Sequence, residues 1–263
     1  MKITILGAGN IGSAFVRGLL SEGTTPSDDI ILTDISLETL APFSALGIYT
    51  MLNNVEAVKN ADIVVICVKP YIVRDLIEEI LPSLSDKVLL VSFAAGITLD
   101  QLKQFAGKRP LFRVIPNTAM EVCQSMTCIA VSDDVSVEQR NMILHLISRV
   151  GKAKIIDESL MNAATVIASC GTAFALRFMR ATMAAGVEIG FKPEVAQELA
   201  SQTMLGAAAL ILVNENHPEA EIDKVTTPKG ITIKGLNEME HVGFSSAVMK
   251  GINASYEILN PKN

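Results

Sequence analysis

Apolar and polar positions follow different patterns in the two halves of the chain. In the first half, short apolar runs rich in β-branched residues are separated by segments of helical periodicity. This alternation is typical of a parallel sheet whose connecting helices cover both faces. The runs predict strands over residues 2–6, 30–33, 63–68, 88–93, 111–115, 127–131 and 154–156.

Helical signals lie between several of these runs. Residues 71–81 carry an apolar helical face that ends before Pro82. Its members are Ile72, Val73, Leu76, Ile77 and Ile80. Thr98 and Ser136 each precede a glutamine by three residues, which is the spacing of a capping box at a helix start.

The strand pattern stops near residue 157, and the rest of the chain predicts helices rich in Ala, Met, Leu and Gly. Pro193 suits a first helical turn, so we expect a helix from there towards Asn216. The pattern therefore predicts an α/β domain over residues 1–157 and an all-helical domain over residues 158–263.

Two strongly apolar stretches, residues 161–189 and 205–213, raise the question of membrane spans. Arg177, Arg180 and Glu188 interrupt the first, and the second is short. We expect no membrane association. We expect both stretches to be helices buried in a subunit interface, with a homodimer as the smallest assembly.

A glycine-rich turn follows the first predicted strand and opens a helix. It comprises Gly7, Ala8, Gly9, Asn10, Ile11 and Gly12. In this context the first glycine permits a tight turn, the second lets the backbone approach a pyrophosphate, and the third lets the helix pack closely. Unpaired N–H groups at the helix start favour phosphate. The turn predicts a dinucleotide-binding Rossmann domain with a doubly wound parallel sheet, although incidental glycines in a strand-to-helix turn are the alternative.

Asp34 ends the second predicted strand, where an acidic residue can bind the ribose hydroxyls of the adenosine. A carboxylate there would repel a 2'-phosphate, which favours NAD over NADP. Capping of the next turn is the alternative role for Asp34.

Charge and cysteine usage exclude several other classes. The net charge is -6 with a pI near 5.2, and no basic cluster is present, so nucleic acid is not expected as a partner. The N-terminal residues lack the pattern of a secretory signal, so we expect a cytoplasmic protein. The four cysteines lack zinc-binding spacing, so we expect buried free thiols and no metal site. The cysteines are Cys67, Cys123, Cys128 and Cys170, and the histidines, expected to be structural, are His145, His217 and His241.

Residues 225–236 read Val-Thr-Thr-Pro-Lys-Gly-Ile-Thr-Ile-Lys-Gly-Leu and are followed by Met239 and Glu240. This run resembles the VTSPGGTT-like signature of the pyrroline-5-carboxylate reductase family, which leads into GL and LE. Residues 68–70, 92–97, 113–118, 244–247 and 251–252 add to the resemblance, in order and at family-like spacing. The resemblance covers essentially the whole chain.

The resemblance implies a cytoplasmic oxidoreductase that reduces 1-pyrroline-5-carboxylate to L-proline with NADH or NADPH, the last step of proline biosynthesis. It implies that the helical domain, residues 158–263, dimerises and binds substrate, and that dimers build larger rings. Further coenzyme contacts would be Asn54, Val68, Lys69 and Pro70 near the adenosine and ribose, with Ala94, Ala95 and Asn117 near the nicotinamide. Substrate contacts would be Thr227, Gly230, Ile231, Thr232 and Glu158.

Within this implied site, the Thr232 hydroxyl would point at the ring nitrogen and serve catalysis. A substrate already protonated in solution needs no strong acid, so positioning should dominate. Taken alone, Lys69 is a surface lysine, Asn54 and Asn117 are turn asparagines, Thr232 is a helix cap and Glu158 is an exposed first-turn glutamate.

The chain departs from the family pattern at three positions. Ala119 stands where proline is usual, and Lys229 stands where glycine is usual. Thr172 lies in residues 169–174, a run that more typically reads SGSGPAY. Lys229 must tolerate a backbone geometry that glycine adopts more freely. Two alternatives stay open: a reductase of another cyclic imine or a 2-oxo acid, and a non-catalytic dinucleotide-binding paralogue.

Overall fold

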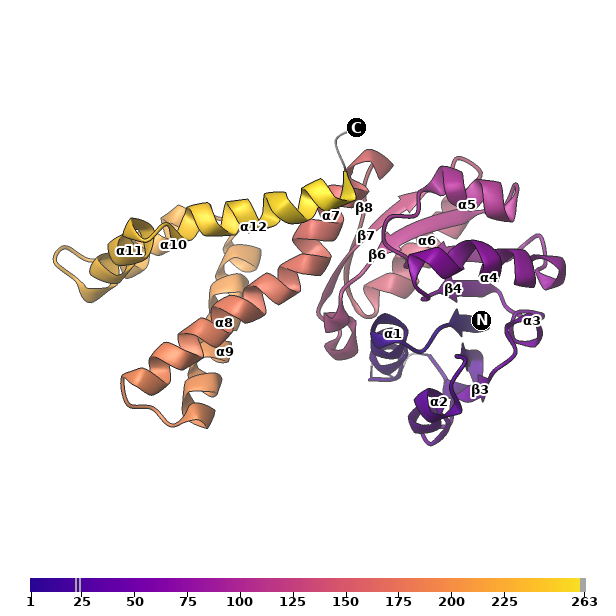
Figure 1. Ribbon diagram of the computed structural model, residues 1–263, viewed down its shortest axis with the longest axis horizontal. Helices are drawn as coiled ribbons and strands as arrows, with labels where there is room; N and C mark the ends of the chain where they lie inside the picture. Colours follow the sequence, from indigo (N-terminus) through magenta and orange to yellow (C-terminus); the bar gives the residue numbers. More distant parts are fainter. Residues whose placement is uncertain (22, 24, 261–263) are drawn as a thin grey trace. The chain divides into compact units, whose positions relative to one another are not determined.

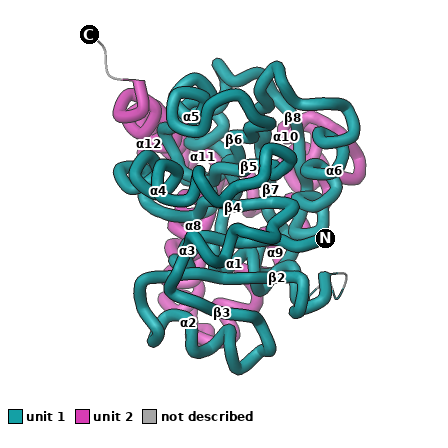
Figure 2. The backbone as a smooth tube through the Cα atoms, turned by 90° about the vertical axis from the view of Figure 1, so that its right-hand side faces the viewer, with its two compact units in different colours: residues 1–172 teal, residues 173–263 magenta. Residues whose placement is uncertain are grey.

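The computed structural model describes residues 1–21, 23 and 25–260 of the chain. The chain divides into two compact units, Met1–Thr172 and Ala173–Asn263 (Figure 2). Residues 158–172 belong to the first unit because buried side chains such as Met161 and Val166 pack there. The sequence-based domain division after residue 157 stays a prediction.

Unit 1 is built on an eight-stranded sheet with the order β3-β2-β1-β4-β5-β6-β7-β8. Figure 1 shows this sheet together with the helices of unit 1. Strands β1 to β6 are parallel, β7 runs antiparallel to β6, and β8 is parallel to β7. The expected parallel sheet is thus confirmed for its larger part, and its β7–β8 edge is reversed. The strands are β1 Ile3–Leu6, β2 Ile30–Thr33, β3 Tyr49–Met51, β4 Ile63–Ile66, β5 Leu89–Ser92, β6 Leu111–Ile115, β7 Ser125–Val131 and β8 Gly151–Ile155.

The strands that the sequence predicts least well lie at the two sheet edges. The pattern missed β3 because this three-residue strand has no fully buried residue and therefore no apolar run. It placed β8 at residues 154–156, although the strand begins at Gly151. Alternate residues of β8 are exposed, so it lacks the continuous apolar run of a central strand.

Helices cover both faces of the sheet. They are α1 Asn10–Ser21, α2 Leu37–Ser44, α3 Asn54–Ala57, α4 Val73–Ile80, α5 Leu99–Ala106, α6 Val137–Ser148 and α7 Met161–Ala164. Both predicted capping boxes, at Thr98 and Ser136, are present. The helix predicted over residues 71–81 is shorter, because Pro70–Ile72 form a 3-10 turn that leaves Ile72 38% exposed.

Two hydrophobic cores, one on each face of the sheet, explain why the strands read as continuous apolar runs. One core packs α1 and α6 against side chains such as Ile5 and Phe112. The other packs α4 and α5 against neighbours such as Leu6 and Leu111. Successive strand residues point to opposite faces, so a strand covered on both sides is apolar throughout. The predicted doubly wound sheet is confirmed.

Unit 2 is helical in its described residues. Its elements are α8 Gly171–Glu188, which begins within unit 1, α9 Pro193–Asn214, α10 Pro218–Val225, α11 Ile231–His241 and α12 Phe244–Leu259. The predicted helix start at Pro193 is confirmed. Within the part of unit 2 that the structure describes, Ala196 and Ala200 are the buried residues, and many large apolar side chains are exposed. By length and composition alone, the stretches Glu158–Glu188 and Pro193–Asn214 could cross a membrane, which is a weak indication.

Candidate active site

The glycine turn lies at the carboxyl end of β1, where the strand order of the sheet reverses. Strand β1 pairs with β2 on one side and with β4 on the other. Ligands of doubly wound sheets bind at this switch point, outside the carboxyl ends of the strands. Helix α1 begins at Asn10 and has no acidic residue in its first turn. Its N–H groups and its dipole therefore favour an anion.

The three glycines fit a bound pyrophosphate for different reasons. Gly7 adopts φ +104°, which side chains other than glycine rarely accept. A Cβ on Gly12 would lie 2.0 Å from the Gly7 carbonyl oxygen, so α1 could not pack at this distance with any other residue. A Cβ on Gly9 would meet nothing within 4 Å, so the space above this backbone is open to a ligand.

Asp34 connects the glycine turn to the end of β2. Its Oδ2 accepts a hydrogen bond from Ala8 N at 2.9 Å, and its Oδ1 accepts one from Ser36 N at 3.1 Å. The carboxylate therefore has the capping role that the sequence left open. Each oxygen retains a further lone pair, so ribose hydroxyls can still donate to it.

The other predicted coenzyme residues lie at the same edge of the sheet, because β1 to β6 are parallel. Asn54 begins α3 and accepts a hydrogen bond from the Thr33 hydroxyl at 2.7 Å. Val68, Lys69 and Pro70 follow β4, and Ala94 and Ala95 follow β5. The sheet thus gathers these segments at one edge, while their contacts with a coenzyme stay a prediction.

Asn117 follows β6 at this edge and has a structural role as well. It is buried, its Oδ1 accepts from Ala119 N at 2.9 Å, and its Nδ2 donates to Ala168 O at 2.9 Å. Ala168 lies in a π-helical turn, Thr165–Cys170, between α7 and α8. Asn117 therefore fixes this turn beside the carboxyl end of β6.

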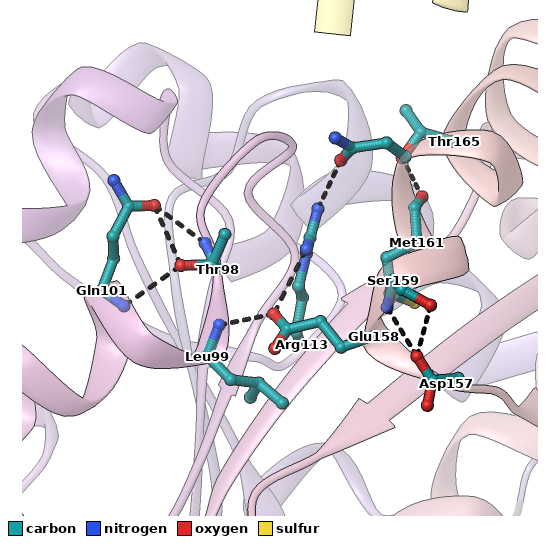
Figure 3. A network of polar contacts seen from close by, with 10 residues as sticks. Thr98, Leu99, Gln101, Arg113, Asp157, Glu158, Ser159, Met161 and Thr165 are labelled. Atoms are coloured by element: carbon teal, nitrogen blue, oxygen red, sulfur yellow. Dashed lines mark hydrogen bonds and ion pairs between the residues drawn. The ribbon is translucent and has the colours of Figure 1, made fainter. Parts of the chain in front are cut away.

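Glu158 and Arg113 form an ion pair beside the same loops (Figure 3). Arg113 Nη1 lies 3.3 Å from Glu158 Oε1, and this oxygen also accepts from Leu99 N at 2.6 Å. Arg113 Nη2 donates to Asn162 Oδ1 at 2.8 Å. No sequence motif predicts a function for Arg113 or Asn162. The available signal was a charged residue inside the apolar strand β6.

The predicted substrate segment forms a tight turn before α11 in unit 2. Gly230 N donates to Thr227 O at 2.8 Å, and Gly230 is the N-cap residue of α11, whose first turn contains no acidic residue. A Cβ on Gly230 would lie 2.6 Å from Thr227 Oγ1 and 2.9 Å from Thr227 O, so a larger residue there would force the turn to shift. Lys229 adopts φ +61° in the left-handed region. Thr232 is the second residue of α11 and is exposed.

Histidines and cysteines take structural positions in the described residues. His217 caps α10, where its Nδ1 accepts from Glu219 N. His145 lies within α6, and His241 ends α11. Cys128 is buried as expected. Cys67, Cys123 and Cys170 are only partly buried when the exposure of the whole residue, main chain included, is counted. Desolvation by burial raises the pKa of the Cys67 thiol well above its usual range, which keeps the thiol neutral.

The glycine turn at the switch point and the two-unit architecture define a Rossmann-type dinucleotide-binding protein with a helical partner unit. The family profile described as NADP oxidoreductase, coenzyme F420-dependent, matches residues 2–96. The profile described as pyrroline-5-carboxylate reductase dimerisation matches residues 158–260. The chain belongs to the pyrroline-5-carboxylate reductase family.

Individual relatives support this membership over nearly the whole chain. Pyrroline-5-carboxylate reductase 2 of Dictyostelium discoideum is 39% identical, over 97% of this chain and 91% of the relative. Pyrroline-5-carboxylate reductase 1 of the same organism is 38% identical over 96% of this chain, which spans only 48% of that longer relative. The solved structure of Plasmodium falciparum pyrroline carboxylate reductase with NADP bound has a TM-score of 0.89 at 25% identity, covering 98% of this chain and 97% of that chain.

Proposed function

We propose that this chain is an enzyme that reduces 1-pyrroline-5-carboxylate to L-proline with NADH or NADPH, in proline biosynthesis. The glycine turn at the sheet's switch point carries the proposal, because its open Gly9 backbone and close-packed Gly12 fit a dinucleotide. Relatives named for this reaction, 39% and 33% identical over 97% and 95% of the chain, support the substrate.

The reaction assigns a task to each unit. Bound NAD(P)H would supply the hydride that adds to the imine carbon. The glycine turn of unit 1 would hold its pyrophosphate, with Asp34 and Asn54 near the adenosine ribose, Val68, Lys69 and Pro70 beside them, and Ala94, Ala95 and Asn117 near the nicotinamide. The substrate's protonated imine already carries the positive charge that hydride addition needs, so the protein's main work is orientation.

The turn before α11 would hold the substrate. Ile231 would bind its carboxylate through the backbone N–H and Thr227 through its hydroxyl, since helix starts favour anions. Gly230, whose N–H donates to Thr227 O, would border the carboxylate and leave room for it. The Thr232 hydroxyl would orient the ring nitrogen. The family resemblance implies a place near the substrate for Glu158. Its own carboxylate oxygen Oε1, however, already accepts hydrogen bonds from Leu99 and Arg113.

Asp34 supports a preference for NADH. Its carboxylate lies at the end of β2, where a 2'-phosphate would meet a like charge. The residues that follow, Ile35, Ser36, Leu37 and Glu38, supply no cation to offset this repulsion. NADPH would therefore bind more weakly than NADH.

Unit 2 supports a homodimer in which its exposed apolar helices are buried, and larger rings can be built from such dimers. The match of residues 158–260 to a dimerisation domain supports this assembly. A subunit interface accounts for the exposed apolar surface of α8 and α9 without a membrane. We also propose a cytoplasmic location, and the net charge of -6 supports the absence of nucleic-acid partners.

Steady-state assays test the function directly. Oxidation of NADH and NADPH is followed with 1-pyrroline-5-carboxylate, with other cyclic imines and with 2-oxo acids. We expect the highest kcat/KM for 1-pyrroline-5-carboxylate with NADH. Faster turnover of another imine or oxo acid would show that this compound, and not 1-pyrroline-5-carboxylate, is the substrate. Coenzyme binding without any turnover would favour a non-catalytic paralogue, which the departure at Lys229 makes worth testing.

A further inference from the structure

Arg113 is a charged side chain in the middle of a buried strand whose other residues are apolar. Its side chain is only 3% exposed. Burying a charged group is costly unless it is paired and hydrogen-bonded. An apolar residue would fill the same space without this cost. We therefore ask what the arginine gains for the fold, and the answer lies in the two segments to which its guanidinium is bonded.

The first bond leads to the segment between β5 and α5. Glu158 Oε1 receives both Arg113 Nη1 and the backbone N–H of Leu99, the first residue of α5 (Figure 3). At the other end of the segment, Ser92 pairs with Arg113 in the sheet. Residues 93–98, which include Ala94 and Ala95, are therefore held at both ends by groups connected to Arg113.

The second bond leads to the helical segment that follows β8. Arg113 Nη2 donates to Asn162 in α7, and Asn117 donates to Ala168, which lies six residues after Asn162 in the π-helical turn. Strand β6 and the loop after it thus hold this segment at two points. π-helical turns are frequent at functional sites.

We propose that Arg113 is a positioning residue for hydride transfer, acting through Glu158 and Asn162. The inference rests on the proposed function, in which Ala94, Ala95 and Asn117 border the nicotinamide. Misplacement of reacting groups by about 1 Å can cost roughly 100-fold in rate. Loosening the network therefore lowers kcat. Coenzyme affinity changes little, because the proposed contacts of the glycine turn, Asp34 and Asn54 lie outside the network and stay in place.

Glu158 offers the sharpest test, because it is 31% exposed and its variants should fold. Glu158→Ala removes the acceptor for both Leu99 N and Arg113. Glu158→Gln keeps an amide oxygen in the same place but removes the charge. Arg113→Lys keeps the charge but replaces the planar fork, so it cannot hold both partners in the same geometry.

We expect Glu158→Ala to lower kcat about tenfold and to leave the KM for coenzyme within about twofold of the wild type. With NADH deuterated at the transferred position, the kinetic isotope effect on kcat should rise as hydride transfer becomes slower than the other steps. Glu158→Gln should restore most of kcat, and Arg113→Lys should fall between the two. Arg74→Ala, which breaks an exposed pair with Glu78 on α4, is the matched control and should leave all these values unchanged.

Two results would overturn the inference. Wild-type kcat and isotope effect in Glu158→Ala, whatever its melting temperature, would show that the network only stabilises the fold. Equal losses in Glu158→Gln and Glu158→Ala, together with wild-type kcat in Arg113→Lys, would show that the Glu158 charge acts on the substrate directly. A wild-type chain without turnover would instead refute the proposed function, and the two failures are therefore distinguishable.

Discussion

Single atoms decide which residues the glycine turn of unit 1 and the turn before α11 of unit 2 can contain. At Gly12 an added Cβ would overlap the Gly7 carbonyl oxygen, and at Gly230 it would crowd the Thr227 hydroxyl. Asp34 holds Ala8 N and Ser36 N with its two oxygens while leaving lone pairs for a ligand. The two glycines tolerate few substitutions, whereas the side chains of Thr232 and Lys229 are exposed and can be exchanged for others of similar size.

Asp34→Ser should shift coenzyme preference towards NADPH. Loss of the carboxylate removes the repulsion of a 2'-phosphate and also the acceptor for ribose hydroxyls. We expect the ratio of kcat/KM for NADH to that for NADPH to fall at least tenfold. An unchanged ratio would show that Asp34 serves only to cap the turns around it.

Thr232→Ala should lower kcat with 1-pyrroline-5-carboxylate about tenfold, the scale of one hydrogen bond lost in the transition state. Thr232→Ser keeps the hydroxyl and should stay close to the wild type. Both are compared by steady-state kinetics at saturating coenzyme. Equal turnover in Thr232→Ala and the wild type would remove Thr232 from the mechanism.

Lys229→Met should raise the KM for the anionic substrate about threefold, because an exposed charge pair contributes up to about 1 kcal/mol. The variant keeps the length of the side chain and removes only the charge. The KM of the wild type should rise with added salt, and that of the variant should respond less. A lower KM in Lys229→Met would mean that the ammonium crowds the substrate instead of attracting it.

At the scale of elements, caps and loops after the parallel strands fix the site more than the strands themselves do. Capping boxes at Thr98 and Ser136 begin α5 and α6 where the sequence predicts. Asp157 caps the turn that begins with Glu158, accepting from the backbone N–H and the hydroxyl of Ser159. These local bonds place Glu158 at the end of β8, next to the network with Arg113.

Ser159→Ala should make the free energy of unfolding less sensitive to acid. In the folded chain the Ser159 hydroxyl and N–H hold the pKa of Asp157 below the usual value of an aspartate. A depressed folded pKa contributes stability that is present above the unfolded value and is lost as the pH falls through the folded pKa. Between pH 7 and pH 3, the free energy of unfolding measured in urea should therefore fall less in Ser159→Ala than in the wild type.

At the scale of the molecule, the two units differ in how much they can stabilise themselves. Unit 1 has a core on each face of its sheet. The described part of unit 2 buries little, and exposed apolar side chains such as Val213, at 78%, are common along its helices. A helical unit with so many exposed apolar side chains and so few buried ones should be stable only in an assembly.

Light scattering at micromolar concentration should therefore give a mass of at least two chains, each of 28.2 kDa. Dilution should lower the melting temperature, because dissociation of an obligate dimer is coupled to unfolding. A mass of one chain, together with a concentration-independent melting temperature, would contradict the proposed dimer.

Local sequence features determined most of the Rossmann unit. The bounds of β2 and β6 follow from their apolar runs, the capping boxes from a side chain and a glutamine three residues on, and the glycine turn from its place between a strand and a helix. Each of these depends on residues close together in the chain, so a single sequence contains the whole signal.

Tertiary structure decided what depends on residues far apart. The β3 edge strand and the reversal of β7 arise from pairing partners that no local pattern specifies. The meeting of Arg113 with Glu158, 45 positions later, and of Asn117 with Ala168 is likewise a consequence of how the strands are ordered. The sequence shows which residues can carry charge or donate hydrogen bonds, but only the folded chain determines their partners.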